Sequence, residues 1–321
     1  YRIVATGPTG EMRYPRVDDT VTYDGTIVAD PTLTTELPVF HWYIEEADYQ
    51  EAINDEPLGH LYTDDTEPAV LYFDGKLYDA AQVRVRGKSA RSWMKKHWKF
   101  KLPQGHNLEA PGLLERDVDN FNLQSGYVDK SFVREILAWE SFRDAGAPNH
   151  QMFHVRLQRN GQFFGLYAFL EDPEADWVAR NALSPDAARY KADGGDLGPA
   201  NPAELDQIYQ KVNPPDQDYS ELAALIQGLN GPAGAAKTAF LYDNLDLPGI
   251  VNYIAVQTII HNNDHMAKNY FLYRDLPRSR RWAVHAWDLD LTFGKNFDGD
   301  SVFSDVIWAD NDALPGYPSY I

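Results

Sequence analysis

The chain contains no cysteine among its 321 residues. This absence excludes disulfide bonds, thiolate metal sites and a cysteine nucleophile. It suits an exported bacterial protein about as well as a cytoplasmic one. The sequence also lacks any run close to the ~18 apolar residues that a membrane-spanning helix requires, so we expect no membrane span.

Positive charge is scarce, since 29 Lys and Arg residues face 48 Asp and Glu residues and leave a net charge of −19. Such a surface repels phosphates, so we expect no nucleic-acid partner. The charge suits a protein that acts on a basic partner, although acidic solvation of the surface is the commoner explanation. The apolar content of 44% is enough for a large core, either in one two-lobed domain or in two domains.

The first half of the chain carries short segments with the alternation typical of β-strands. Asp74-Gly75 and Asn160-Gly161 have the composition of hairpin turns between such segments. The predicted strands cover residues 38–44, 70–73, 76–78, 81–86, 96–102, 152–158 and 162–170. Residues 1–37 are polar and indicate an extended arm or the end of a preceding module.

The second half is predicted to be mostly helical and to contain one further hairpin. Its predicted helices cover residues 171–181, 219–229, 234–242 and 247–261, and two further helices, over residues 45–54 and 131–145, are predicted in the first half. Residues 194–217 are rich in Gly, Pro and Asp and indicate a loop or an insertion, while residues 269–274 and 281–287 indicate the hairpin. This order predicts an α+β fold with a strand-rich first half and a helix-rich second half.

The pattern that points most directly to chemistry is Asp264, Asn269 and Asp288. Asp264 and Asn269 stand five positions apart, as the Asp and Asn of a kinase catalytic loop do, and Asp288 follows a later apolar strand. Asp264 is predicted to accept the proton of a substrate hydroxyl, while Asn269 and Asp288 hold magnesium through oxygen atoms. Asp290 shares the extended segment with Asp288 and is predicted to be an auxiliary ligand. The alternative for Asp264 and Asn269 is a chance spacing of common loop residues, and the alternative for Asp288 and Asp290 is a capped turn.

A basic stretch in the first half is predicted to bind phosphate. Arg86 leads into Gly87, Lys88 and Ser89, a turn that offers cations and backbone N–H groups. Lys99 and Lys101 share one face of a predicted strand and are predicted to contact phosphate oxygens. The alternative is a solvated basic strand face, and the glycine-rich fingerprints of ordinary kinases and P-loop enzymes are missing.

Three glutamates complete the predicted site. Glu135 or Glu140, on the predicted helix over 131–145, is expected to pair with the strand lysine, with an ordinary surface charge as the alternative. Glu171 follows an apolar strand and is predicted to lie near a nucleotide base. Its alternative role is to begin a helix, which the helix dipole favours.

The motifs together resemble the CotH kinase family, a group of atypical, protein-kinase-like spore-coat proteins. The matching stretches are residues 83–89, 95–102, 129–146, 160–167 with Glu171, 263–273 and 287–294. The family often has Asn where this chain has Lys88, a difference that adds a cation near the predicted phosphates.

The resemblance implies a two-lobed, protein-kinase-like fold over residues 38–321, with an N-lobe over about 38–170 and a C-lobe over about 171–321 that contains the hairpin. It also implies ATP, with Mg²⁺ or alternatively Mn²⁺, and phosphorylation of Ser or Thr on a protein. It places Asp264 in the catalytic loop and Asp288 at the metal, and it favours an extracellular, cell-surface or spore-coat location in a bacterium. The acidic surface suggests a basic, Ser-rich substrate. Two alternatives are a non-catalytic surface or adhesion protein and a nucleotidyl transferase.

Overall fold

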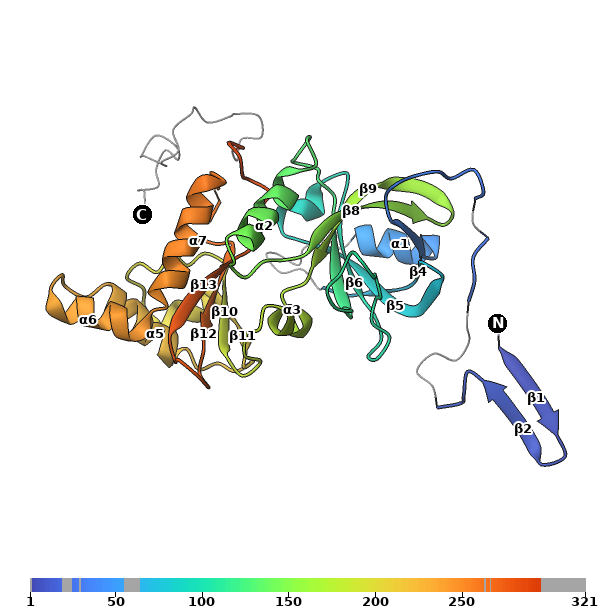
Figure 1. Cartoon of the computed structure of the whole chain (residues 1–321), viewed down its shortest axis with the longest axis horizontal. Helices are drawn as coiled ribbons and strands as arrows, with labels where there is room; N and C mark the ends of the chain where they lie inside the picture. Colours follow the sequence, from blue (N-terminus) through green and yellow to red (C-terminus); the bar gives the residue numbers. More distant parts are fainter. Residues whose placement is uncertain are drawn as a thin grey trace. The chain divides into compact units, whose positions relative to one another are not determined.

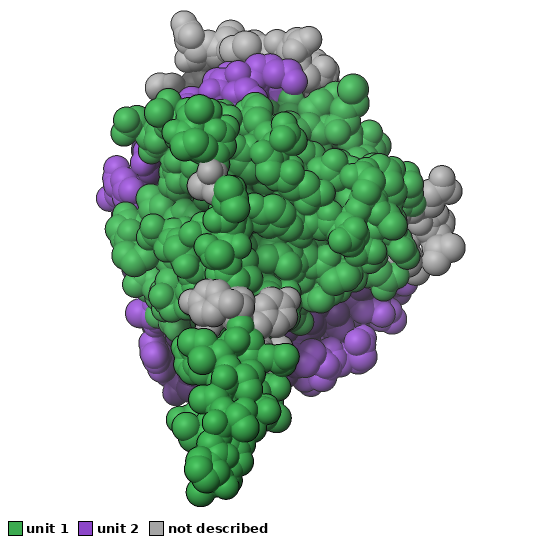
Figure 2. Space-filling model, turned by 90° about the vertical axis from the view of Figure 1, so that its right-hand side faces the viewer, with its two compact units in different colours: residues 1–127, 150–180 green, residues 128–149, 181–321 purple. Residues whose placement is uncertain are grey.

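The chain divides into two compact units, one of residues 1–127 with 150–180 and the other of residues 128–149 with 181–321 (Figure 2). The structure, a computed structural model, describes residues 2–18, 25–28, 30–54, 64–262, 264–265 and 267–295. Asn263, in the predicted catalytic loop, lies outside these residues, as does the tail from residue 296. The predicted division of residues 38–321 at residue 170 stays a prediction.

The first unit is built on a closed barrel of seven strands (Figure 1). The strands, in barrel order, are β3 (Val39–Tyr43), β4 (Glu67–Phe73), β5 (Lys76–Arg86), β6 (His97–Lys101), β7 (Asn120–Gln124), β9 (Gln162–Glu171) and β8 (Met152–Arg159). Neighbouring strands are antiparallel except β3 and β8, whose parallel pairing closes the barrel. The unit also contains β1 (Ile3–Gly7), β2 (Gly10–Tyr14), α1 (Glu46–Ile53), η1 (Ser89–Ser92) and α3 (Ala175–Arg180).

Aromatic rings fill the barrel. Trp42 on β3 and Trp98 on β6 are fully buried, with ring centroids 4.7 Å apart. Phe121 on β7 stacks on Phe100 at 5.1 Å and on Phe169 at 5.3 Å. These rings come from strands distant in sequence, so the core stabilises the closed arrangement and not one hairpin alone.

The second unit contains a four-stranded antiparallel sheet in the order β11-β10-β12-β13. The strands are β10 (Ala188–Ala192), β11 (Tyr209–Asn213), β12 (Tyr270–Arg274) and β13 (Trp282–Ala286). The helices are α2 (Arg134–Asp144), η2 (Pro202–Glu204), α4 (Leu205–Ile208), α5 (Ser220–Leu229), α6 (Ala235–Asn244) and α7 (Leu247–Ile259). Helix α7 packs along β13 (Figure 1), so its end and the ends of the β12–β13 hairpin are held in one structure.

The predicted two-lobed, protein-kinase-like fold is wrong. The strand-rich half closes into a barrel, because β7 joins β6 to β9 and β3 pairs with β8. The predicted helix-rich lobe with an inserted hairpin is a unit with a sheet, because β10 and β11 extend the hairpin to four strands. Strand β11 lies within residues 194–217, so the prediction of a loop there is wrong in that part.

Most of the individual elements are confirmed, including the hairpins at Asp74-Gly75 and Asn160-Gly161 and the helices α2, α5, α6 and α7. Within the predicted arm of residues 1–37, β1 and β2 form an antiparallel pair. Across the parts of the chain that the structure describes, no helix has the length and hydropathy needed to cross a bilayer.

Candidate functional site

The loop after α7 is organised by the buried side chain of Asn262. Its Nδ2 donates to Oε1 of Gln257 on α7 at 2.9 Å, and its Oδ1 accepts the backbone N–H of Asp264 at 3.0 Å. The carbonyl oxygen of Asn262 lies 2.9 Å from Nδ1 of His265. Because these bonds join the loop to the helix, the backbone that carries Asp264 has a defined direction.

Asp264 and Asn269 are in direct contact, as their predicted shared site requires. Nδ2 of Asn269 donates to Oδ2 of Asp264 at 2.8 Å and to its backbone oxygen at 3.0 Å. Nζ of Lys268 lies 2.9 Å from the same Oδ2 atom. Both Asp264 and Asn269 are buried, whereas the side chain of Lys268 is 49% exposed. The loop therefore presents a carboxylate that holds an amide on one side and a cation on the solvent side.

Asp288 lies at the same end of the β12–β13 hairpin as Asn269. Tyr270 pairs with Ala286, and the N–H of Trp287 donates to the carbonyl of Asn269 at 3.0 Å. Asn269 and Asp288 both have left-handed backbones, with φ of 63° and 57°. Asn and Asp tolerate this region better than most residues, and strained positions of this kind concentrate at functional sites.

Burial and mutual repulsion set the charges of this acidic cluster. Burial raises the pKa of Asp264 to about 6, with a further contribution from Asp288, although Lys268 and Asn269 oppose the shift. Burial also raises the pKa of Asp290 well above its ordinary value, and the charges of Asp288, Glu135 and Asp264 add to it. For Lys268, burial lowers the pKa, but the carboxylates, led by Asp264, outweigh burial and raise it overall. The cluster is therefore short of positive charge.

A divalent cation fits this donor set. Carboxylate and amide oxygens are the ligands of hard cations, and Mg²⁺ usually takes only one or two protein carboxylates and completes its shell with water and substrate phosphates. Within the described residues, no three His, Asp or Glu side chains already converge as a ready metal cage. The arrangement is thus that of a partial site, with Asn269, Asp288 and Asp290 as the residues that would hold the ion.

The two helix glutamates differ in their surroundings. Glu135 on α2 is buried, and its charge acts on Asp290 in the acidic cluster. Glu140 has a side chain that is 46% exposed and lies 3.9 Å from Arg143. Of the two candidates for a partner of the strand lysine, Glu135 is the one that belongs to the surroundings of the site, and that pairing stays a prediction.

The predicted phosphate-binding turn lies in the first unit, at the end of β5. Gly87 has φ of 93°, a left-handed conformation that glycine adopts without strain. Nη1 of Arg86 donates to Oε1 of Gln124 at 2.8 Å, and Lys88 and Ser89 are exposed. Buried Arg91 donates from Nε to the carbonyl of Gly87 at 2.8 Å and so holds the turn closed. The turn has the exposure that a phosphate contact needs.

Lys99 and Lys101 on β6 have different surroundings. Nζ of Lys99 lies 2.6 Å from Oδ2 of Asp172 and 2.8 Å from Oε1 of Glu174. Burial lowers the pKa of Lys99, but these two carboxylates raise it more, and Lys99 in turn holds the pKa of Asp172 below its ordinary value against the opposing effect of burial. Lys101 is exposed. Lys99 would have to exchange these carboxylates for phosphate oxygens in order to bind a nucleotide.

Glu171 is fully buried and forms an ion pair with Arg180, 2.6 Å from Nη2 to Oε2. Burial raises the pKa of Glu171, and Arg180 opposes the shift. Oε2 also accepts the backbone N–H of Gln151 at 3.1 Å. These contacts give Glu171 a structural part in the first unit, while its contact with a nucleotide base stays a prediction.

The sequence motifs did not indicate Lys268 and Asn262, although both belong to the same loop. Lysine four positions after an aspartate is a pattern that predicts an ion pair only in a helix, and the described residues of this loop, 264–265 and 267–269, are not helical. Asn262 carries no signal that separates it from any other loop asparagine. Asp172 was not predicted because its partner, Lys99, is distant in sequence. Arg180 was not predicted because its partner, Glu171, belongs to a different element.

A sequence model of the family described as CotH kinase protein matches residues 83–313. Among curated proteins, the inner spore coat protein H of Bacillus subtilis (strain 168) is 23% identical over 280 residues, which make up 85% of this chain and 74% of that protein. The family match confirms the resemblance that the sequence motifs indicated.

Proposed function

The chain belongs to the CotH kinase family, and on that premise we propose that it is an ATP- and divalent-metal-dependent kinase of Ser or Thr residues in proteins. The observation that carries the proposal is the hydrogen-bonded pair of Asp264 and Asn269 at the end of the hairpin where Asp288 also lies. Phosphoryl transfer needs positioning and charge neutralisation more than covalent chemistry by the protein. The hydrogen-bonded pair of Asp264 and Asn269, with Asp288 at the same end of the hairpin, meets that need.

Asp264 is proposed to orient the acceptor hydroxyl and take its proton. A general base is most effective when its pKa is close to the working pH, and burial raises the pKa of Asp264 to about 6. The hydrogen bond from Asn269 fixes one carboxylate oxygen, Oδ2. Lys268, on the solvent side, contacts the same oxygen. Oδ1 is proposed to face the substrate.

Asn269, Asp288 and Asp290 are proposed to hold the metal. A bound Mg²⁺ or Mn²⁺ would neutralise charge on the phosphates of ATP. The raised pKa of Asp290 reflects repulsion from its acidic neighbours after burial, and a cation would relieve that repulsion. On the first unit, Arg86, Lys88 and Ser89 are proposed to contact the phosphates, with Lys99 and Lys101 on the adjacent strand.

The proposed substrate is a basic, Ser-rich protein of the spore coat or cell surface. The net charge of −19 attracts a basic chain, and a relative of this protein is named an inner spore coat protein. Peptides with the same Ser content but basic, neutral or acidic flanks separate this preference from the activity itself. Equal phosphorylation of the three peptides would contradict the preference and leave the kinase proposal intact.

The intact mass of a basic, Ser-rich protein after incubation with ATP and Mg²⁺ tests the reaction type. A kinase adds one phosphoryl group per modified residue, with ADP as the other product. Addition of AMP would instead identify nucleotidyl transfer and overturn the proposal. No change in mass over a panel of basic and neutral proteins, with Mn²⁺ tested as well, would support a non-catalytic surface protein.

A further inference from the structure

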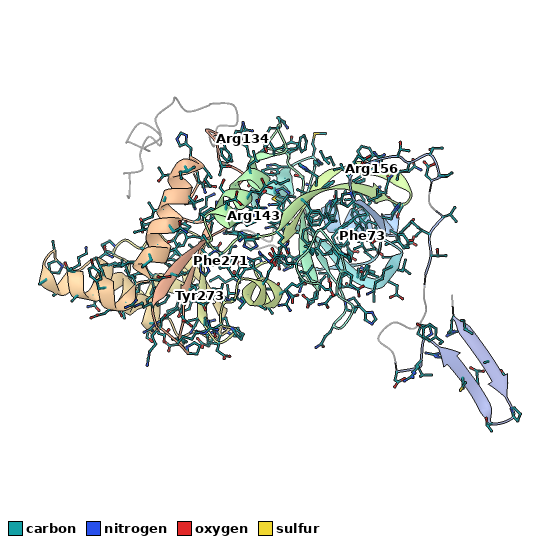
Figure 3. All side chains as sticks on the ribbon, in the orientation of Figure 1. Phe73, Arg134, Arg143, Arg156, Phe271 and Tyr273 are labelled. Atoms are coloured by element: carbon teal, nitrogen blue, oxygen red, sulfur yellow. The ribbon has the colours of Figure 1, made fainter. Side chains whose placement is uncertain are left out.

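The second unit contains a pocket of about 420 Å³ outside the acidic cluster. It lies between the start of α7, the end of α2 and the β12–β13 turn, and this volume falls in the usual range for ligand sites. Its floor includes the buried side chains of Tyr253, Tyr273 and His285, and Tyr273 and His285 have ring centroids 5.1 Å apart. Figure 3 labels Tyr273 on β12.

The pocket and the acidic cluster share the β12–β13 hairpin, and the pocket extends along β13 from the turn to Ala286, two positions before Asp288. Asn269 directly precedes β12 and Asp288 follows β13, whereas Tyr273 and the turn of residues 275–281 lie at the far end. Five strand residues separate the two ends by roughly 13 Å at ~3.3 Å per residue. The mouth of the pocket, at the turn, therefore lies about one strand length from the cluster, and the two paired strands join them.

The turn at the mouth of the pocket concentrates positive charge in a chain of net charge −19. Arg278, Arg280 and Arg281 are all exposed, and no ion pair involves them in the part of the chain that the structure describes. Arg278 and Arg281 line the pocket and Arg280 does not. Guanidinium groups recognise phosphate through paired N–H donors, so the mouth is suited to a phosphate group.

One buried polar atom at the pocket, Oδ1 of Asp275, has no hydrogen-bond partner among the described residues. The other oxygen of Asp275, Oδ2, accepts from the backbone N–H of Ser279 at 3.1 Å and from its hydroxyl at 3.2 Å, which holds the turn in shape. Oδ1 is left to accept an N–H group from a ligand, which a bare phosphate ion does not have.

We propose that this pocket binds a phosphorylated peptide segment. Arg278 and Arg281 hold the phosphate at the mouth, Oδ1 of Asp275 accepts a main-chain N–H of the peptide, and an apolar or aromatic side chain next to the phosphorylated residue enters the pocket over Tyr253. The site would retain a protein that already carries phosphate close to the acidic cluster. Binding of the peptide does not depend on the proposed kinase activity. The retention of kinase substrates through this binding rests on the proposed function.

Fluorescence anisotropy of a fluorescein-labelled Ala-Leu-phosphoserine-Tyr-Ala peptide tests the proposal with the full chain. We expect the phosphopeptide to bind at least about tenfold more tightly than the same peptide without phosphate, since one charge-assisted contact has this magnitude. Arg278→Ala and Arg281→Ala should each weaken binding by about tenfold. Arg280→Ala is the matched control, since it removes the same charge from the same turn, and it should change binding less than about twofold because screened surface charges act weakly.

Three results would overturn the proposal. They are equal affinity for the two peptides, an equal loss in Arg280→Ala and in the two pocket variants, and competition by inorganic phosphate as strong as that by unlabelled phosphopeptide. Ala147→Phe, which narrows the pocket without changing charge, should also weaken binding, and circular dichroism checks that it folds. Asp264→Ala should bind the phosphopeptide as wild type does, so a failed kinase assay and a failed pocket are distinguishable.

Discussion

Replacing Asp264 by Asn should stabilise the folded protein at neutral and alkaline pH. Burial raises the pKa of this carboxyl from its ordinary value of 3.8 to about 6. The folded state thus favours the protonated form, and ionisation of Asp264 costs stability. The penalty is absent below pH 3.8, grows as the pH rises toward 6 and is fully present above that value.

The magnitude follows from the two pKa values. The difference between 3.8 and about 6 corresponds to about 3 kcal/mol, at 1.36 kcal/mol per pH unit. This difference already includes the opposing effect of the ion pair with Lys268, so the loss of that pair requires no further subtraction. An amide oxygen at position 264 can still accept from Nδ2 of Asn269. We therefore expect Asp264→Asn to raise the free energy of unfolding by about 3 kcal/mol at pH 8.

Urea unfolding between pH 4 and pH 8, in EDTA to remove metal ions, measures the effect. The difference between Asp264→Asn and wild type should be largest at pH 8 and should shrink through pH 6. Asp243→Asn, at an exposed position on α6, is the control and should show no such trend. A variant that is less stable than wild type at pH 8, or a difference that does not depend on pH, would refute the assignment of a penalised, buried carboxylate to Asp264.

Three further substitutions test the surrounding structure. Lys268→Met removes the cation that opposes the rise in the pKa of Asp264, so a ¹³C carboxyl NMR titration should give Asp264 a pKa above about 6. An unchanged pKa would show that Lys268 does not stabilise the charged carboxylate. Arg180→Ala leaves Glu171 buried without its partner and should cost about 3–5 kcal/mol in urea unfolding at pH 8, more than the double change with Glu171→Gln; equal losses would argue against the pair. Trp98→Ala should cost about 3–5 kcal/mol because the ring is fully buried in the barrel, and a loss below about 1 kcal/mol would place it outside the core.

The sequence predicted those features that depend on neighbouring residues. Alternation and turn composition located most strands of the barrel and the β12–β13 hairpin, and apolar periodicity located α2 and α7. The barrel could not be predicted in this way, because its closure depends on the parallel pairing of β3 with β8. Strand β7 has the sequence Asn-Phe-Asn-Leu-Gln, and all five of its residues are buried. Its polar residues are not typical of a buried strand, so the sequence pattern did not predict it.

In the candidate site too, the sequence predicted what depends on nearby residues and did not predict what depends on distant ones. The five-residue spacing of Asp264 and Asn269 identified two side chains that lie in contact in the structure. The spacing did not indicate the left-handed backbones of Asn269 and Asp288, nor the hydrogen bond from the N–H of Trp287 to the carbonyl of Asn269. It also could not show that Lys99 is paired with Asp172, because that contact joins β6 to the segment after β9.

The measurement that tests the central proposal most directly is transfer of label from γ-labelled ATP to a basic, Ser-rich protein in the presence of Mg²⁺ or Mn²⁺. Wild type is compared with Asp264→Ala, Asp288→Ala and the exposed control Asp243→Ala. We predict full activity for the control and a loss of about 10²-fold or more for Asp264→Ala, the magnitude of general-base catalysis. We predict a similarly large loss for Asp288→Ala, with nucleotide binding weakened more than in Asp264→Ala. Equal labelling by wild type and both site variants would contradict the account.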